Sequence, residues 1–274
     1  MKRIVTGLCR LAGLTRQGYY RARRTREYAQ MDEARLIAWV HQERSAQPRL
    51  GGRKLHHVLK PAQQNEQIKV GRDRFFDLLR RHDLLVKRKP KKARTTYRDP
   101  ALPVYRNLLS DLTPTQPHQV WVSDITYLAT EEDFVYLSLV TDRVSRQIVG
   151  WNLASSLDAK ESVKALRRAI AQLPQGRWPI HHSDRGSQYC CHEYVEVLQA
   201  RGLSISMTEE NHCYENSCAE RVNGILKSEY NLDAKFRTKA QALRATKQAI
   251  ELYNHRRPHT SLRMQTPAQV HAAK

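Results

Sequence analysis

Residues 120–154 read VWVSDITYLATEEDFVYLSLVTDRVSRQIVGWNLA, and this stretch decides the fold class. It consists of runs rich in β-branched and aromatic residues, separated by short polar turns such as TEED. Such runs predict three consecutive β-strands, at residues 120–129, 134–142 and 146–154. An all-helical protein is therefore excluded.

The pattern changes after residue 154 to alternating helices and short strands. Residues 158–173 predict a helix with Asp158 as its N-cap, and another helix ends at Gly202. Short apolar runs predict strands at residues 179–184 and 203–208. The order β-β-β-α-β-α-β-α indicates an α/β fold with a mixed five-stranded sheet flanked by helices.

Charge is distributed unevenly along the chain. The net charge is +17 over residues 1–100, −4 over residues 101–230 and +7 over residues 231–274, which gives +20 in total. Because Lys and Arg displace condensed counterions from nucleic acid, two basic flanks favour a polyanion partner. A charge that served solubility alone would explain the total but not this segregation.

The chain carries neither a membrane-length apolar run nor a signal-peptide pattern. A membrane helix needs roughly 18 apolar residues, so we expect no membrane association and a cytoplasmic protein, bound to the nucleoid through DNA. The 5 cysteines form no CxxC pair, so we expect free thiols rather than a zinc site.

The composition changes along the chain and predicts four segments, at residues 1–30, 31–86, 87–112 and 113–274. The first suits a small helix-turn-helix segment, with a basic amphipathic helix packed on a neighbouring domain as the alternative. The second predicts a further helical, DNA-binding domain of helix-turn-helix type, and the third a basic linker that lies on phosphates or acts as a solvated tether. The last holds the α/β domain and a basic C-terminal tail.

Three carboxylates stand out in the α/β domain. Asp124 lies inside an apolar strand, where an unpaired carboxylate is costly unless a partner such as a metal ion offsets it. Asp184 closes a strand, and Glu220 lies in the first turn of a helix. These hard oxygen ligands favour Mg²⁺ or Mn²⁺ over zinc, and three of them can hold two ions about 4 Å apart. Asp142 is interpreted as a turn residue.

The spacing of these acids and the motifs around them resemble a known family. Between Asp184 and Glu220 lie 35 residues, and the acids stand within WVSDITYL, HHSDRGSQY and YENSCAERVNGILKSE, with RQIVGW and YNHRRPHTSLRMQTPAQ as further motifs. Nearly the whole chain resembles the catalytic open reading frame B product of two-frame insertion sequences. That resemblance implies an RNase H-like core of the retroviral-integrase type, with an all-α helix-turn-helix region before it.

The resemblance assigns roles to the three acids. It implies that Asp124, Asp184 and Glu220 are the catalytic residues and the ligands of two Mg²⁺ or Mn²⁺ ions. Glu215 stands where such proteins usually carry Asp in a Tyr-Asp-Asn triplet, so a role as a substitute ligand stays open.

Several neighbours of the acids are candidates for supporting roles. Lys227 lies two helical turns after Glu220 on the same face, which suits a DNA contact, although a solvated lysine fits too. The other predicted DNA contacts are Asn223, Arg185, Arg256 and Arg257. His182 and Asn216 are predicted to support the catalytic acids, with packing as the alternative for His182. Packing of the tail on the core is the alternative for the two tail arginines.

The resemblance implies a DDE transposase that cleaves at element ends and joins 3′-hydroxyls to target DNA. It also implies a homo-oligomer that holds both ends, and a partner, the upstream open reading frame A product, separate or fused. Two other classes stay open: a non-catalytic, sequence-specific DNA-binding regulator, and an RNase H-like nuclease that does not join. The three acids disfavour the first, and the long basic flanks disfavour the second.

Overall fold

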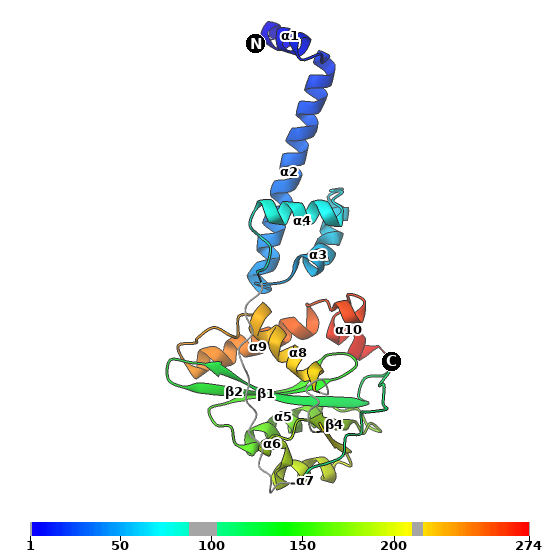
Figure 1. Cartoon of the computed structure of the whole chain (residues 1–274), viewed down its shortest axis with the longest axis vertical. Coiled ribbons are helices and arrows are strands. Elements are labelled where there is room, and N and C mark those ends of the chain that lie inside the picture. Colours follow the sequence, from blue (N-terminus) through cyan, green and yellow to red (C-terminus); the bar gives the residue numbers. More distant parts are fainter. Residues whose placement is uncertain (1, 88–102, 210–215, 274) are drawn as a thin grey trace. The chain divides into compact units, whose positions relative to one another are not determined.

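The computed structural model describes residues 2–87, 103–209 and 216–273 (Figure 1). Most of the predicted linker and Glu215 lie outside these residues. The chain folds into two units, which we describe separately. Unit 1 comprises Met1–Ala46 and Gly51–Val86, and unit 2 comprises Gln47–Leu50 and Lys87–Lys274.

Unit 1 is helical, as predicted, but its division differs from the predicted one. Its helices are α1 (Lys2–Leu11), α2 (Arg16–Ala46), α3 (Gly52–Asn65) and α4 (Arg72–Arg81). The predicted boundary between residues 30 and 31 falls inside α2, which is continuous over 31 residues. Strong helix formers such as Arg, Ala, Glu and Gln fill this stretch and no proline interrupts it, so nothing ends the helix. Figure 1 shows α2 extending beyond α3 and α4.

The core of unit 1 lies where the C-terminal half of α2 meets α3 and α4. Its buried apolar side chains are Leu36, Val40, Leu55, Leu59, Phe75, Leu78 and Leu79. They recur at helical spacing on each element, so one apolar stripe per helix builds this core.

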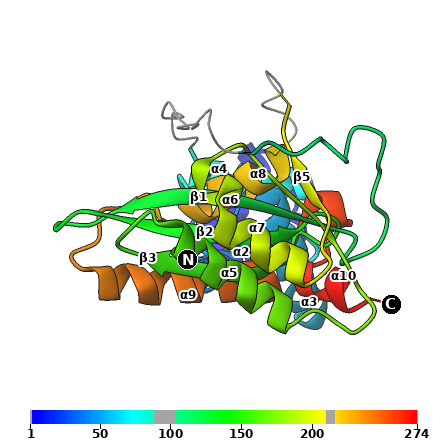
Figure 2. The same cartoon turned by 90° about the horizontal axis from the view of Figure 1, so that it is seen from below.

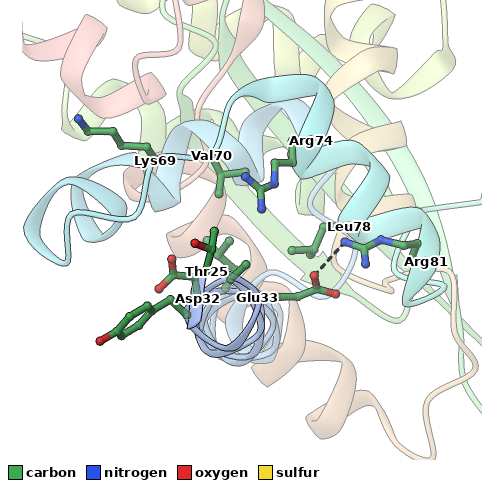
Figure 3. A pocket seen from close by; sticks show the side chains of 11 residues that line it. Thr25, Asp32, Glu33, Lys69, Val70, Arg74, Leu78 and Arg81 are labelled. Atoms are coloured by element: carbon green, nitrogen blue, oxygen red, sulfur yellow. Dashed lines mark hydrogen bonds and ion pairs between the residues drawn. The ribbon is translucent and has the colours of Figure 1, made fainter. Parts of the chain in front are cut away.

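Unit 1 also contains a pocket of about 310 Å³ between α2 and α4 (Figure 3). Arg81 reaches from α4 to Glu33 on α2, with 2.9 Å between Nη2 and Oε2. Asp32 on α2 and Arg74 on α4 also line the pocket. Because its charges are of both signs, the pocket offers no uniform field for a polyanion.

Unit 2 contains the predicted mixed sheet. Its strands are β1 (Val120–Ala129), β2 (Phe134–Asp142), β3 (Ile148–Ala154), β4 (Ile180–Ser183) and β5 (Ile205–Met207). Their spatial order is β3-β2-β1-β4-β5. Strands β1, β2 and β3 pair antiparallel, whereas β4 runs parallel to both β1 and β5. The three predicted consecutive strands are confirmed.

Helices cover both faces of this sheet. They are α5 (Ala159–Ala171), α6 (Ser187–Cys190), α7 (His192–Ala200), α8 (Ser217–Glu229), α9 (Lys239–His255) and α10 (Pro267–Ala272). Figure 1 shows α8 and α9 on one side of the strands and α5, α6 and α7 on the other; Figure 2 views the latter side. None of the helices in the described part of the chain is long and apolar enough to cross a membrane.

Two apolar layers hold the sheet between its helices. On one face, Leu137 and Leu139 pack with Val222 and Leu226 of α8 and Tyr253 of α9. On the other face, Trp121 and Val149 pack with Leu166 of α5 and Leu198 of α7. Alternate residues of one strand face opposite sides, so β1 contributes to both layers.

Gly150 allows α5 to lie close against β3. A Cβ atom at this position would overlap the carbonyl oxygen of Ala165 and come within 2.8 Å of the Cβ of Ala169. Both contacts belong to a packed helix rather than to a flexible side-chain end. The closeness of α5 to the sheet therefore depends on a residue without a side chain.

We predict that Gly150→Ala lowers the free energy of unfolding by about 1–3 kcal/mol, because α5 must move away from β3. The measurement is a urea unfolding curve. Gly224→Ala on α8 is the matched control: its Cβ meets nothing within 4 Å. Alanine there should be neutral or stabilising by up to about 1 kcal/mol. Equal stability of the Gly150 variant and the wild type would contradict the packing argument.

Candidate active site

Asp124 and Asp184 are brought to neighbouring positions by strand register. The last parallel pair between β1 and β4 is Val122 with His182. Two residues further along each strand stand Asp124, in the middle of β1, and Asp184, directly after β4. Residues two apart point to the same face, and neighbouring strands lie about 4.8 Å apart. The two aspartates therefore share one face of the sheet, where β4 ends.

The Asp124 carboxylate is buried and hydrogen-bonded. Only 3% of Asp124 is exposed. Its Oδ2 accepts a hydrogen bond of 2.8 Å from the Nδ2 of Asn223 on α8, and its Oδ1 accepts one of 3.0 Å from the backbone N–H of Ile125. These bonds offset part of the cost of burying a charge in a strand.

Helix α8 is anchored to β1 beside this carboxylate. Asn216, at the N-cap position, donates from Nδ2 to the backbone oxygen of Ser123 at 3.0 Å. Ala219 packs against Val120 and Val122 of β1. The start of α8 is thus fixed against the strand that carries Asp124.

Glu220 lies in the first turn of α8 and is exposed. Residues three apart on a helix are surface neighbours, so Glu220 stands next to Asn223, which binds Asp124 directly. Within the described residues, however, no group of three or more Asp, Glu, His or Cys side chains is gathered closely enough to hold a metal ion. Carboxylates repel one another unless a cation lies between them, which favours such an open arrangement.

The structure places Asn223 differently from the predicted DNA contact. It is 4% exposed and its amide is bonded to Asp124, so its side chain is positioned to orient a carboxylate. Asn216, predicted to support the acids, is likewise buried and bonds to the backbone next to Asp124.

Asp184 and Arg185 form hydrogen bonds with nearby backbone groups. The Oδ1 of Asp184 accepts a hydrogen bond of 3.1 Å from the N–H of Gly186. Arg185 donates from Nε to the backbone oxygen of Thr208 at 2.6 Å. Arg185 is therefore held beside the acid, partly buried, rather than extended into solvent.

His182 is fully buried on β4, and its Nδ1 lies 2.9 Å from the Oγ of Ser206. Burial, with Arg143 nearby, lowers the pKa of His182 to about 4. The imidazole is thus neutral at pH 7. These observations match a packing and hydrogen-bonding role, the alternative that the sequence left open.

Lys227 lies in the last turn of α8, and its Nζ stands 4.3 Å from the ring centroid of Tyr127 on β1. At this distance the ammonium group is attracted by the face of the aromatic ring. Tyr127 is a neighbour of the site that sequence reasoning missed, because an aromatic residue in a strand signals only strand propensity.

The two tail arginines differ sharply. Arg257 is 2% exposed and forms a two-pronged ion pair with Glu229, with bonds of 2.8 and 2.7 Å. Burial alone would lower the pKa of Arg257, but the hydrogen bonds and the negative charge of Glu229 raise it above its usual value. Arg257 is therefore paired with Glu229 inside the fold, which matches packing of the tail on the core, the alternative to a DNA contact. Arg256 is exposed.

Asp142 organises a turn, as its sequence position suggested. Its Oδ1 accepts hydrogen bonds from the backbone N–H groups of Val144 and Ser145, and its Oδ2 accepts one from the N–H of His118. The carboxylate is fully buried at the end of β2. It is thus committed to the turn between β2 and β3.

Known proteins match this chain along most of its length. Models of the integrase core domain match residues 114–213 and 201–267. The "Insertion element IS600 uncharacterized 31 kDa protein" of Shigella sonnei is 34% identical over 265 residues, which cover 95% of this chain and 96% of that protein. The transposase InsF for insertion sequence IS3A of Escherichia coli (strain K12) is 34% identical over 234 residues, 82% of this chain and 78% of that protein.

Among solved structures, the catalytic core domain of HTLV-2 integrase in complex with magnesium is similar. It has a TM-score of 0.47 and 21% sequence identity, over 59% of this chain and 100% of that one.

The sheet with its flanking helices, and the carboxylates at the end of β4, define an integrase-type core. The chain belongs to the insertion-sequence transposases with an integrase core domain, a family of polynucleotidyl transferases. The predicted family and fold class are confirmed.

We predict that Arg257→Ala lowers the free energy of unfolding by about 3–5 kcal/mol, because it removes the buried guanidinium that forms two hydrogen bonds with the partly buried carboxylate of Glu229. Arg256→Ala removes an exposed charge from the same segment and should cost about 1 kcal/mol or less. Thermal and urea unfolding of both variants measure the difference. Similar losses in both would show that the ion pair does not stabilise the fold.

Proposed function

We propose that this transposase cleaves DNA at the ends of its insertion sequence and joins the resulting 3′-hydroxyls to target DNA, using Asp124, Asp184 and Glu220 as ligands of two Mg²⁺ or Mn²⁺ ions. One observation carries the proposal. A buried strand aspartate, Asp124, lies two residues beyond the last β1–β4 pair, as Asp184 does, and is bonded to the helix that bears the third acid.

The residues present fit divalent ions. Carboxylate oxygens are hard ligands of the kind that Mg²⁺ and Mn²⁺ prefer. In addition, the buried Oδ1 atoms of Asn216 and Asn223 have no hydrogen-bond partner among the described residues. Buried polar atoms of native proteins are usually paired, so both can accept from ordered water beside the acids.

Each residue then has a role. Bound divalent ions supply a lowered pKa for the attacking water or 3′-hydroxyl and charge that stabilises the leaving oxygen. Asn223 holds one Asp124 oxygen toward α8, which fixes the direction of the other. Asn216 fixes the start of α8, the helix that carries Glu220, against the strand that carries Asp124.

DNA contacts surround this site in the proposal. Lys227 and Arg256 bind phosphates near the acids, and Arg185 does so after releasing Thr208. The segments 1–30 and 31–86 recognise element ends, and the basic linker lies along the backbone. The protein acts as a homo-oligomer in the cytoplasm, at the nucleoid, with the open reading frame A product as a separate or fused partner.

The test is a joining assay. Purified protein is mixed with a labelled duplex that ends in the sequence flanking the gene, with Mg²⁺, and with open reading frame A product in a parallel reaction. We expect joined product from the wild type and a loss of at least about 100-fold with Asp124→Asn, Asp184→Asn or Glu220→Gln, because each removes a ligand. Chelation with EDTA should abolish joining.

Glu131→Gln is the matched control, since it removes an equal charge from an exposed turn. Cleavage without joining would instead establish a nuclease. DNA binding with neither reaction, in the presence of the upstream partner, would establish a regulator. Retained joining in the Glu220 variant would contradict the assignment of that acid.

A further inference from the structure

Two aromatic rings are exposed at the end of the β1–β2 hairpin. Tyr127 is 45% exposed and Phe134 is 47% exposed. Their ring centroids lie 5.2 Å apart in an edge-to-face arrangement. Single exposed apolar residues are ordinary, but a pair in contact on a strand surface forms a patch, which is typical of a binding surface.

The end of this hairpin is held in place by the rest of unit 2. The N–H of Phe236 donates to the oxygen of Ala129 at 2.8 Å, and the N–H of Glu131 donates to the oxygen of Phe236 at 2.8 Å. The backbone at the end of β1 and in the first part of the turn is therefore bonded to Phe236, so this end of the hairpin is held in place before any ligand arrives.

A positive charge lies beside the rings. The Nζ of Lys227 stands 4.3 Å from the Tyr127 centroid. An aromatic face next to a cation suits a nucleotide, because a base stacks on the ring while the cation meets a phosphate. A purely apolar protein partner would offer the ammonium group neither a hydrogen-bond acceptor nor a negative charge.

The patch also contacts the helix that carries Glu220. Tyr127 follows Asp124 by three residues on β1, about 10 Å along the strand, and its ring contacts Lys227, two helical turns after Glu220 on α8. A base can stack on an exposed side-chain ring only when it is not stacked and paired inside a duplex, so the ligand of this surface is an unpaired base.

We infer that Tyr127 and Phe134 form a stacking surface for an unpaired base at the DNA end, with Lys227 on the adjacent phosphate. This inference rests on the proposed function, because it places the opened end beside the carboxylates. Tyr127 also holds the Lys227 ammonium in the absence of DNA. On binding, the base takes the ring face that the ammonium occupies.

The test is a binding cycle between the ring and the base. Wild type and Tyr127→Ala are titrated in EDTA against a fluorescent duplex with two unpaired terminal nucleotides, and against the same duplex with abasic sites there. We expect Tyr127→Ala to weaken binding of the first DNA by about 5- to 100-fold, and of the abasic DNA by no more than about twofold. Tyr127→Phe should bind both like the wild type.

Trp178→Ala is the matched control, since Trp178 is 66% exposed but precedes β4, at the opposite end from Asp184. It should not distinguish the two DNAs. Phe134→Ala should also weaken binding of the DNA with unpaired bases, by a smaller factor. This second variant keeps the test valid if Tyr127→Ala does not fold. Circular dichroism checks that each variant is folded.

Equal losses on both DNAs would overturn the inference, because the ring would then act through Lys227 or through contacts between copies of the chain. No loss on either DNA would overturn it as well. The binding measurements need neither metal nor catalysis, so they can be interpreted even if the joining assay fails. If joining succeeds but Tyr127→Ala affects both DNAs alike, the proposed function stands and only the stacking surface is wrong.

Discussion

The hydrogen bond between Asp124 and Asn223 is the contact on which the site depends. A carboxylate in the middle of an apolar strand destabilises a fold unless polar partners meet it. Here the partner comes from α8, so the strand that carries Asp124 is bonded to the helix that carries Glu220. The hydrogen bond that offsets the burial of Asp124 therefore also fixes the position of that helix.

The sheet supplies the second constraint. β1 is central, with antiparallel β2 on one side and parallel β4 on the other. The pairing of β1 with β4 ends at Val122 and His182, just before both aspartates. Both aspartates therefore follow the last paired residues of their strands, at the end of β4. Packing on both faces of the sheet holds these strands in place.

Much of this arrangement could be predicted from the sequence. Runs such as VWVSDITYLA encode strands through their own side chains, and Asp124 is conspicuous there because it breaks an apolar pattern. Features that depend on a distant partner could not be predicted. The pairing of Arg257 with Glu229 and of Asn223 with Asp124 spans 28 and 99 residues of chain. The continuity of α2 was missed for another reason. Without a helix breaker such as proline, the sequence alone does not show whether two adjacent helical stretches form one helix or two.

Direct measurement of Mn²⁺ binding by electron paramagnetic resonance tests the central claim, that the three acids form one metal site. A variant with Asp124→Asn, Asp184→Asn and Glu220→Gln is compared with one carrying the same charge changes in the exposed turn, at Glu131, Glu132 and Asp133. We predict that the turn variant binds Mn²⁺ like the wild type and that the first variant loses this binding. Equal Mn²⁺ binding by the two variants would contradict it.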